Sequence, residues 1–596
     1  MPVSPNADSD GPVKLVIKAN GQAIADTLQV LSVTVQKAIN KVPRAEIVLL
    51  DGDMPTGAFP ASEGDSFKPG GEITISAGYG QNADLIFSGV VVGQRLSIDR
   101  EHQGLLTVDC RDKAAAMTVG RKNANFVDKK DSDIATKLIG DAGGLSADVG
   151  ATDTQWKELV QYYCTDWDFL IARAEVNGFV VIVNDGKVSF KAPDTSAAAA
   201  LKVTFGTDLV DLQASLEARD QLANVKATAW DIKNQKVMAA TAPPQSLNVQ
   251  GNLDSSTLAK VLGVGTFGLQ TSTTMESGAL KAWAKAQQVK SGLSRLRGSM
   301  RFQGSAKAKA GGLIELAGVG KRFNGNVYVT AVTHEIRDGD WLTRADFGLS
   351  PTWYAEGGDL EAPAASGLLP GIEGLHIGVV MKLEEDPDGQ FKVQVSTPVM
   401  QAETDGVWAR LMQFHATSGK GAFFLPEIGD EVVLGYFNND PSAPVILGSL
   451  YSSKRKPPYT PANDNYKKAI TTRTGLTLEY DDEKKVITLV TPGKNKIVIS
   501  DDDKSILLAD QNGNTVKLGT DGISLDSPKD IKLSAQGKIS LSALANVEIK
   551  ATQDAKMEGM NVSHSAQIGF TAKGNATAEL SASGQTTVKG ALVMIN

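Results

Sequence analysis

Cysteine is scarce in this sequence, and its scarcity excludes two kinds of architecture. The 596 residues include two cysteines, Cys110 and Cys164, too few for a disulfide framework or a four-cysteine zinc site. Long apolar runs are also missing, since none approaches the roughly 20 residues that span a bilayer. The first twenty residues, MPVSPNADSDGPVKLVIKAN, lack a basic segment followed by an apolar one. We therefore expect a protein made in the cytoplasm without a signal peptide.

Charge and histidine content limit the chemistry further. The formal net charge is −8 with both signs interspersed, so there is no basic stripe and we expect no nucleic-acid partner. The five histidines are scattered, and the His334-Glu335 pair lacks the second histidine of a zinc-protease motif. We expect His334 on the surface of a strand and His564 in a solvated turn. The sequence thus predicts no enzyme, no catalytic residues, no metal and no cofactor.

Three motifs suggest ligand sites but favour simpler structures. GVGTFG, residues 263–268, matches the glycine pattern of dinucleotide-binding loops, but no strand is evident before it and no convincing helix after it. We expect a flexible loop there. YDDEKK and SDDDKS lack the spaced ligands and fixed glycine of a calcium loop, which favours exposed turns.

β-rich segments make up most of the sequence, and its length predicts several domains. Residues 1–112 alternate in short strand-like runs separated by turns, which predicts an antiparallel barrel or sandwich. Residues 113–200 contain helices and a hairpin, with a capping pair at Thr165 and Asp168. Residues 201–365 return to strands around a helical stretch and end in a segment rich in Gly, Pro and Ala.

A small barrel is predicted next, at residues 366–452. Five short strand-like runs in fewer than a hundred residues are typical of an OB fold. The last two lie in FFLPEIGDEVVLGYFNNDPSAPVILGSLY, residues 423–451. A polar linker at residues 453–472 follows.

An eight-residue repeat then occupies much of residues 473–589 and predicts a β-helical needle. Each octad offers only two or three inward side chains, many of them small, and their burial can hardly offset the ordering cost of about 1–2 kcal/mol per residue. Three chains wound together would leave no open strand edge, so we expect a homotrimer. The predicted trimer core consists of Ile523, Leu525, Ile531, Leu533, Ile539, Leu541, Val547, Ile549, Ile568, Leu580 and Val588.

Residues 423–451 resemble the OB-domain motif of the VgrG family, the spike proteins of contractile injection systems. DWDFLIARAEVNGF is similar to the family's hub motif, and VTHEIRDGDWLTRADFGL is similar to the second hub barrel of phage tail hub proteins. The resemblance implies two hub β-barrels with an inserted α/β segment, an OB-fold neck and an intertwined trimeric β-helix. It further implies a structural protein that joins the inner tube to the tip and pierces the target envelope on sheath contraction.

The resemblance also implies the partners. Inner tube and baseplate proteins would contact the hub, effector cargo would travel with the spike, and the target membrane would be touched only during injection. A PAAR-type tip protein would dock on residues 590–596, at Ala591, Leu592, Val593, Met594, Ile595 and Asn596. A closing strand inside the trimer is the alternative reading of these residues.

Two other functions are weighed against this one. The compact layout favours an extracellularly released, phage-tail-like particle, with a type VI secretion spike as the alternative. A polysaccharide-binding or polysaccharide-cleaving tail spike is disfavoured, because the acidic residues of the octads lie mainly at turns and no aromatic platform accompanies them.

Overall fold

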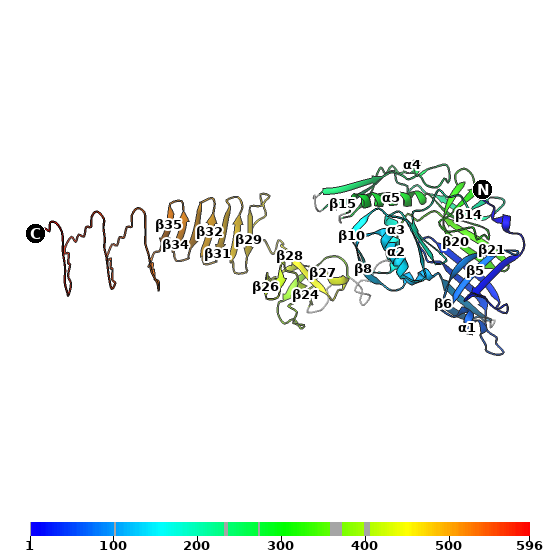
Figure 1. Ribbon diagram of the computed structural model, residues 1–596, viewed down its shortest axis with the longest axis horizontal. Coiled ribbons are helices and arrows are strands. Elements are labelled where there is room, and N and C mark those ends of the chain that lie inside the picture. The colour runs from blue at the N-terminus through cyan, green and yellow to red at the C-terminus, as the bar shows by residue number, and fades with distance from the viewer. Residues whose placement is uncertain are drawn as a thin grey trace. The chain divides into compact units, whose positions relative to one another are not determined.

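The computed structural model describes residues 2–100, 103–231, 236–271, 275–357, 372–398 and 406–595. Its fold is mainly β, which confirms the predicted class, and it divides into two units, Met1–Ser449 and Leu450–Asn596 (Figure 1). His102, Asn596 and most of the Gly/Pro/Ala-rich segment predicted before the OB fold lie outside the described residues.

A thirteen-stranded sheet forms the framework of the first unit. Its main path runs β14-β18-β21-β20-β3-β4-β7-β6-β5-β1-β2, and β19 pairs with both β13 and β20. Strands from both predicted hub barrels share this sheet, because β3 pairs antiparallel with β20. The strands are β1 Val13–Ala19, β2 Gln22–Ala23, β3 Val30–Ala38, β4 Arg44–Leu50, β5 Glu72–Tyr79, β6 Asp84–Ile98, β7 Gly104–Arg111, β13 Leu201–Thr204, β14 Leu209–Leu216, β18 Leu296–Gln303, β19 Leu313–Ala317, β20 Gly325–Arg337 and β21 Asp340–Phe347.

Two separate hydrophobic cores pack against this sheet. Alternate residues of β4, β5 and β7, such as Ile47, Ile75 and Val108, fill the first core. Met300 and Phe347 belong to the second. The period-two alternation of each strand gives one buried face, as expected for a sheet that covers a core on one side.

The inserted segment is an α/β unit with its own core. Helix α2, Asp131–Asp141, and helix α3, Asp166–Val176, pack beside the hairpin of β11, Val180–Asn184, and β12, Lys187–Lys191. The predicted cap is confirmed, since the Thr165 hydroxyl accepts a hydrogen bond from the Asp168 amide at 3.0 Å. The remaining strands here are β8 Lys122–Lys130, β9 Ser146–Val149 and β10 Gln155–Cys164.

Helix α5, Ser277–Leu293, is the longest helix among the described residues and lies against a three-stranded sheet, in the order β16-β15-β17. Helix α5 confirms the predicted helical stretch of this region, and the chain passes into β18 at Leu296. β17 starts inside GVGTFG, which is therefore a loop only at residues 263–266. The other elements are α4 Ser255–Leu258, β15 Val225–Asp231, β16 Lys236–Ala242, β17 Phe267–Gln270 and the 3₁₀ helix η4 Tyr354–Glu356.

The predicted OB fold is confirmed as a closed five-stranded barrel, in the order β22-β23-β24-β28-β27. Its small core includes Val380, Val395 and Leu434. The strands are β22 His376–Lys382, β23 Val393–Ser396, β24 Val407–Leu411, β27 Glu431–Tyr436 and β28 Pro444–Ser449, with a short hairpin of β25 Ala416–Thr417 and β26 Lys420–Gly421.

The second unit opens with a seven-stranded antiparallel meander (Figure 1). It begins at Lys467, within the residues predicted as linker, where the Lys467 ammonium bridges Glu479 and Asp481 on the next strand. The strands are β29 Lys467–Thr471, β30 Thr477–Asp481, β31 Val486–Val490, β32 Lys496–Ser500, β33 Ser505–Ala509, β34 Thr515–Gly519 and β35 Gly522–Asp526. Residues 527–595 form no strand in this single chain.

Candidate functional site

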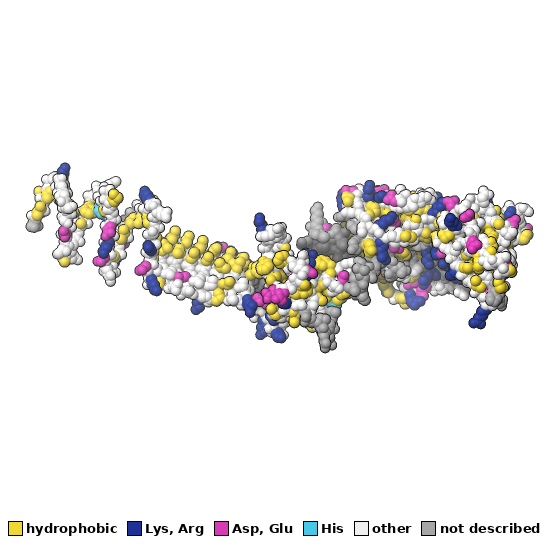
Figure 2. All heavy atoms as spheres, turned by 90° about the horizontal axis from the view of Figure 1, so that it is seen from below, with side chains coloured by type: hydrophobic (Ala, Val, Ile, Leu, Met, Phe, Trp, Pro, Cys, Tyr) yellow, Lys and Arg dark blue, Asp and Glu magenta, His cyan; other side chains and the backbone are white. Residues whose placement is uncertain are grey.

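Two ladders of large apolar side chains cross one face of the meander. One ladder crosses every strand, and the other crosses every strand except β29. Each strand contributes a residue directly opposite one on its neighbour, so each ladder is continuous from strand to strand (Figure 2). The first ladder is Ile470, Leu478, Leu489, Ile497, Leu508, Val516 and Leu525. The second is Tyr480, Ile487, Ile499, Ile506, Leu518 and Ile523.

In the central strands of this sheet, the apolar ladder residues are more exposed to solvent than the residues between them on the opposite face. In β31 the ladder residues Ile487 and Leu489 are 40% and 48% exposed, whereas Thr488 between them is less exposed. Leu507 and Leu508 in β33 show the same contrast. A sheet that covers its own core would bury its aliphatic face, so this face is built to be covered by something other than the rest of the described unit.

The predicted core residues extend the ladders toward the end of the chain. Ile523 and Leu525 close the two ladders in β35, and Ile531 lines the same groove as Leu508 and Leu525. The groove has a volume of about 590 Å³. All eleven predicted core side chains are exposed in the single chain, because the second unit offers no layer to cover them.

The predicted tip-docking residues form an exposed apolar end. Leu592, Val593, Met594 and Ile595 are all exposed. Ala591 is exposed as well. The structure places them in no contact that distinguishes a docking surface from a closing strand.

Most of the ladder residues lie outside the eight-residue repeat. The runs TLEYD, VITLV, KIVIS and SILLA carry a period-two signal that could have found them. Their turns vary in length, so these strands do not share the eight-residue period.

His334 corrects one expectation. It lies in β20, 4% exposed, and not on a strand surface. Its Nδ1 is 3.0 Å from the Thr343 hydroxyl, and its ring lies 5.7 Å from that of Trp341. Burial, with a smaller effect of Lys37, lowers the pKa of His334 to about 3. His334 is therefore a neutral core residue, whose ring completes the packing beneath β20.

The acidic motifs of the second unit serve the turns that contain them. The Asp481 carboxylate accepts from the Lys484 amide at 3.1 Å, and its hydrogen bond with Lys467 lowers the pKa of Asp481. The Asp503 amide donates to the Ser500 hydroxyl. Within the described residues, no group of three His, Cys, Asp or Glu side chains is placed to hold a metal ion. Nor does any described helix combine the length and apolar character needed to cross a bilayer.

Three protein families match the chain. Residues 9–338 match the Alg8 N-terminal domain. Residues 376–451 match the type VI secretion system/phage-baseplate injector OB domain, and residues 486–553 match the phage baseplate V C-terminal trimerisation domain. The second match coincides with the closed barrel, and the third starts at β31 and runs into the octads.

Individual relatives match over shorter stretches. The type VI secretion system spike protein VgrG1b of Pseudomonas aeruginosa is 30% identical over 183 residues, which cover 28% of this chain and 24% of that protein. The actin cross-linking toxin VgrG1 of Vibrio cholerae is 36% identical over 72 residues, 12% of this chain and 7% of the toxin. The chain thus spans at most about a quarter of these curated relatives. Among solved structures, a component of the E. coli type VI secretion system aligns over 73% of this chain and 99% of its own, with 14% identity and a TM-score of 0.37.

Proposed function

Because the chain belongs to the VgrG spike proteins, with an Alg8 N-terminal domain at residues 9–338, we propose that it is the trimeric central spike of a phage-tail-like contractile injection apparatus. In this proposal sheath contraction drives the spike forward, and the needle pierces the target envelope.

The two apolar ladders carry the proposal. Three copies of the sheet, each turning its ladders inward, would close a three-sided prism with an apolar interior. Completing the burial of about a dozen half-exposed aliphatic side chains contributes on the order of 10 kcal/mol per chain. The trimerisation-domain match over residues 486–553 supports the same assembly.

The octads are proposed to continue this prism as an intertwined needle. In one chain they form no strand and leave the predicted core exposed, whereas in three chains each octad gains neighbours on both sides. The layout proposed for the whole chain is a hub at residues 1–365, a neck at 366–452 and a needle that starts at Lys467.

The hub and neck are proposed to connect the inner tube and baseplate to the needle. We assign no catalytic residue, since the function is mechanical and rests on edge-free β-structure. Electron microscopy of the source cells tests the proposed extracellular release. Free sheathed particles in the culture supernatant support it, whereas sheaths confined to the cell envelope indicate a type VI apparatus.

A PAAR-type tip protein is the proposed partner of the chain end. Three copies of the apolar segment at 592–595 would form a blunt exposed end that a cap could cover. Deleting Ala591 to Asn596 should leave the trimer intact, because earlier strands hold it, and abolish co-purification of the tip protein. Full retention of the tip protein by the truncated trimer would show that it docks elsewhere.

The mass of the purified full chain tests the oligomeric state directly. A trimer has three times the 62.9 kDa chain mass, about 189 kDa. Light scattering at micromolar concentration should give this value. A stable, folded species of one chain mass would overturn the proposal.

A further inference from the structure

Two adjacent aromatic residues, Trp353 and Tyr354, hold the segment by which the chain leaves the large sheet. This segment, residues 350–357, follows β21 and contains η4. Any load that passes along the chain between the large sheet and the OB barrel must pass through it. The contacts of Trp353 and Tyr354 therefore decide where such load leaves the hub.

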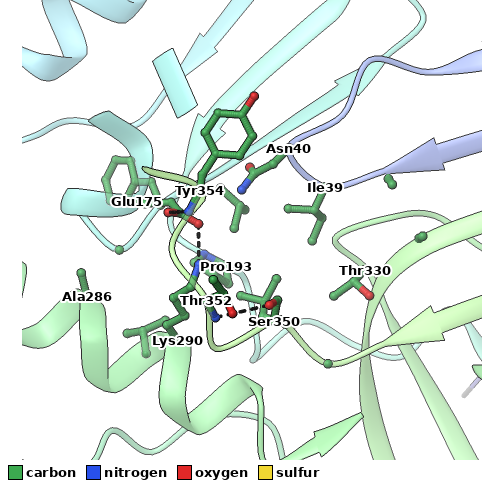
Figure 3. A pocket seen from close by; sticks show the side chains of 18 of the residues that line it. Ile39, Asn40, Glu175, Pro193, Ala286, Lys290, Thr330, Ser350, Thr352 and Tyr354 are labelled. Atoms are coloured by element: carbon green, nitrogen blue, oxygen red, sulfur yellow. Dashed lines mark hydrogen bonds and ion pairs between the residues drawn. The ribbon is translucent and has the colours of Figure 1, made fainter. Parts of the chain in front are cut away.

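Helix α3 holds Tyr354 at two points. The Tyr354 hydroxyl donates to Asp168 Oδ1 at 2.8 Å, and the Tyr354 amide donates to Glu175 Oε2 at 2.6 Å. Asp168 and Glu175 are seven residues apart, which is two helical turns, so both carboxylates face the same side of α3. Figure 3 shows the Tyr354 amide beside the Glu175 carboxylate.

Helix α5 holds Trp353. The indole Nε1 of Trp353 donates to Gln287 Oε1 at 2.6 Å, and the Lys290 ammonium lies 5.5 Å from the centre of the Trp353 ring. Gln287 and Lys290 are three residues apart and share a helix face. The two aromatic residues are thus bound to two different helices.

A buried ion pair joins those helices beneath the segment. Lys290 Nζ lies 2.5 Å from Glu175 Oε1, and the two side chains are 11% and 8% exposed. One Glu175 carboxylate therefore binds both Lys290 and the Tyr354 amide. Hydrogen bonds to charged partners are stronger than hydrogen bonds between neutral groups, so these contacts hold the segment firmly against the two helices.

Release of the segment would withdraw one half-buried side chain, Tyr354, from its packing against the core of the α/β unit. The segment forms one wall of a pocket of about 310 Å³ whose other walls include residues of β3, α3, α5, β11, β20 and β21 (Figure 3). Its release would break the contacts of Trp353 and Tyr354 and leave the two helices in place.

We propose that Trp353 and Tyr354 form a mechanical anchor, the point at which axial load passes from the hub to the neck during injection. This rests on the proposed function as a spike. Trp353 and Tyr354 are positioning residues. They keep the exit of the chain fixed to α3 and α5, so that load is shared by two helices before it reaches the sheet.

Force spectroscopy on the assembled full-length protein tests the anchor, with both handles on one protomer, at Pro2 and Leu375. Release of eight residues adds about 28 Å of contour length, at roughly 3.5 Å per residue. We expect a short step of this size before the hub unfolds. Tyr354→Phe removes the bond to Asp168 and should raise the opening rate of the step about tenfold or more. The force that unfolds the hub should not change.

Tyr79→Phe is the matched control, because it also removes one hydrogen-bonded tyrosine hydroxyl, here bonded to Gln303 at 2.7 Å inside the hub. It should change hub unfolding and leave the short step unaltered. Trp353→Phe, which keeps a ring but loses the bond to Gln287, should weaken the step as Tyr354→Phe does, and serves if the latter fails to fold.

Absence of a short step, or equal opening rates in the native protein and both anchor variants, would overturn the anchor. The mass of the same samples separates this failure from that of the proposed function. A trimer without the step contradicts the anchor alone, whereas a monomer contradicts the spike itself.

Discussion

Replacing Leu508 by Asp should dissociate the spike. Leu508 lies in the first ladder between Ile497 and Val516 and is 42% exposed in the single chain. Completing its burial contributes about 1 kcal/mol per chain, and this is lost. Three unpaired carboxylates enclosed in one apolar prism cost several kcal/mol each. The sum is on the order of 10 kcal/mol per trimer, or about seven powers of ten in the association constant.

Leu507→Asp is the matched control, since it makes the same change one residue earlier, on the opposite face. The cross-strand neighbours of Leu507 are Val498 and Lys517, so the new carboxylate lies beside a cation. The assay is the mass of each variant by light scattering. Protein concentrations from about 0.1 to about 100 µM would detect both weak and strong association.

We expect the Leu508 variant at one chain mass, with the first unit still folded, and the Leu507 variant at three. Ile499→Asp, in the second ladder, should behave like the Leu508 variant. If the Leu507 and Leu508 variants both form trimers of equal stability, this would refute the assignment of the ladder face to the trimer interior.

The remaining predictions concern the first unit. Acid should destabilise it through His334, because burial favours the neutral ring; the stability that this provides is complete above about pH 6.5 and falls by up to about 1.4 kcal/mol per pH unit as the pH drops toward 3. Urea titrations between pH 6.5 and 4 should show that the free energy of unfolding falls less steeply with decreasing pH in His334→Gln than in the native protein. An unchanged dependence on pH would count against this role. Arg173→Met should lower the free energy of unfolding by about 3–5 kcal/mol, because it leaves the buried Asp131 carboxylate without its cation. Lys137→Met, which removes an exposed pair with Asp141, should change it by less than about 0.5 kcal/mol in the same thermal denaturation series, and equal effects would contradict the argument.

Local patterns predicted the OB barrel and helix α3 well. The five strands of the barrel are short, alternating and separated by turn residues, so each can be recognised by itself. Helix α3 carries its own start signal in Thr165 and Asp168, and Gly178 follows its end with a φ of +69°. These features depend on neighbours in the sequence, which a single sequence displays.

Long-range pairing could not be predicted in the same way. The pairing of β3 with β20 joins residues about 300 positions apart, and nothing in either strand identifies its partner. Asp131 is the first residue of helix α2, yet its carboxylate is bound by Arg173, Asn177 and the Trp156 indole. The helix start is held instead by Asp133, which accepts from the Lys130 amide. The burial of a carboxylate such as that of Asp131 depends on which side chains, distant in the sequence, come together in the fold. The amino-acid composition does not reveal these partners.

The residues of the proposed needle could be predicted only in part. The octads identify inward positions such as Ile531 and Ile539, but a single chain leaves these exposed, because the second unit has nothing with which to cover them. The ladder residues of β30–β34 do not follow the eight-residue repeat, because the turns between these strands differ in length. The site is therefore visible in the sequence as two periods, two residues and eight, and its proposed partner is another copy of the chain.

The arrangement of side chains in the assembled needle tests the central claim most directly. Electron cryomicroscopy of the purified full-length protein would show the cross-section at β31–β33. We expect threefold symmetry, with Leu489, Ile497 and Leu508 of all three chains pointing to the axis and Thr488, Val498 and Leu507 pointing outward. A single sheet with its ladders in solvent, or a trimer whose ladders face outward, would contradict the account.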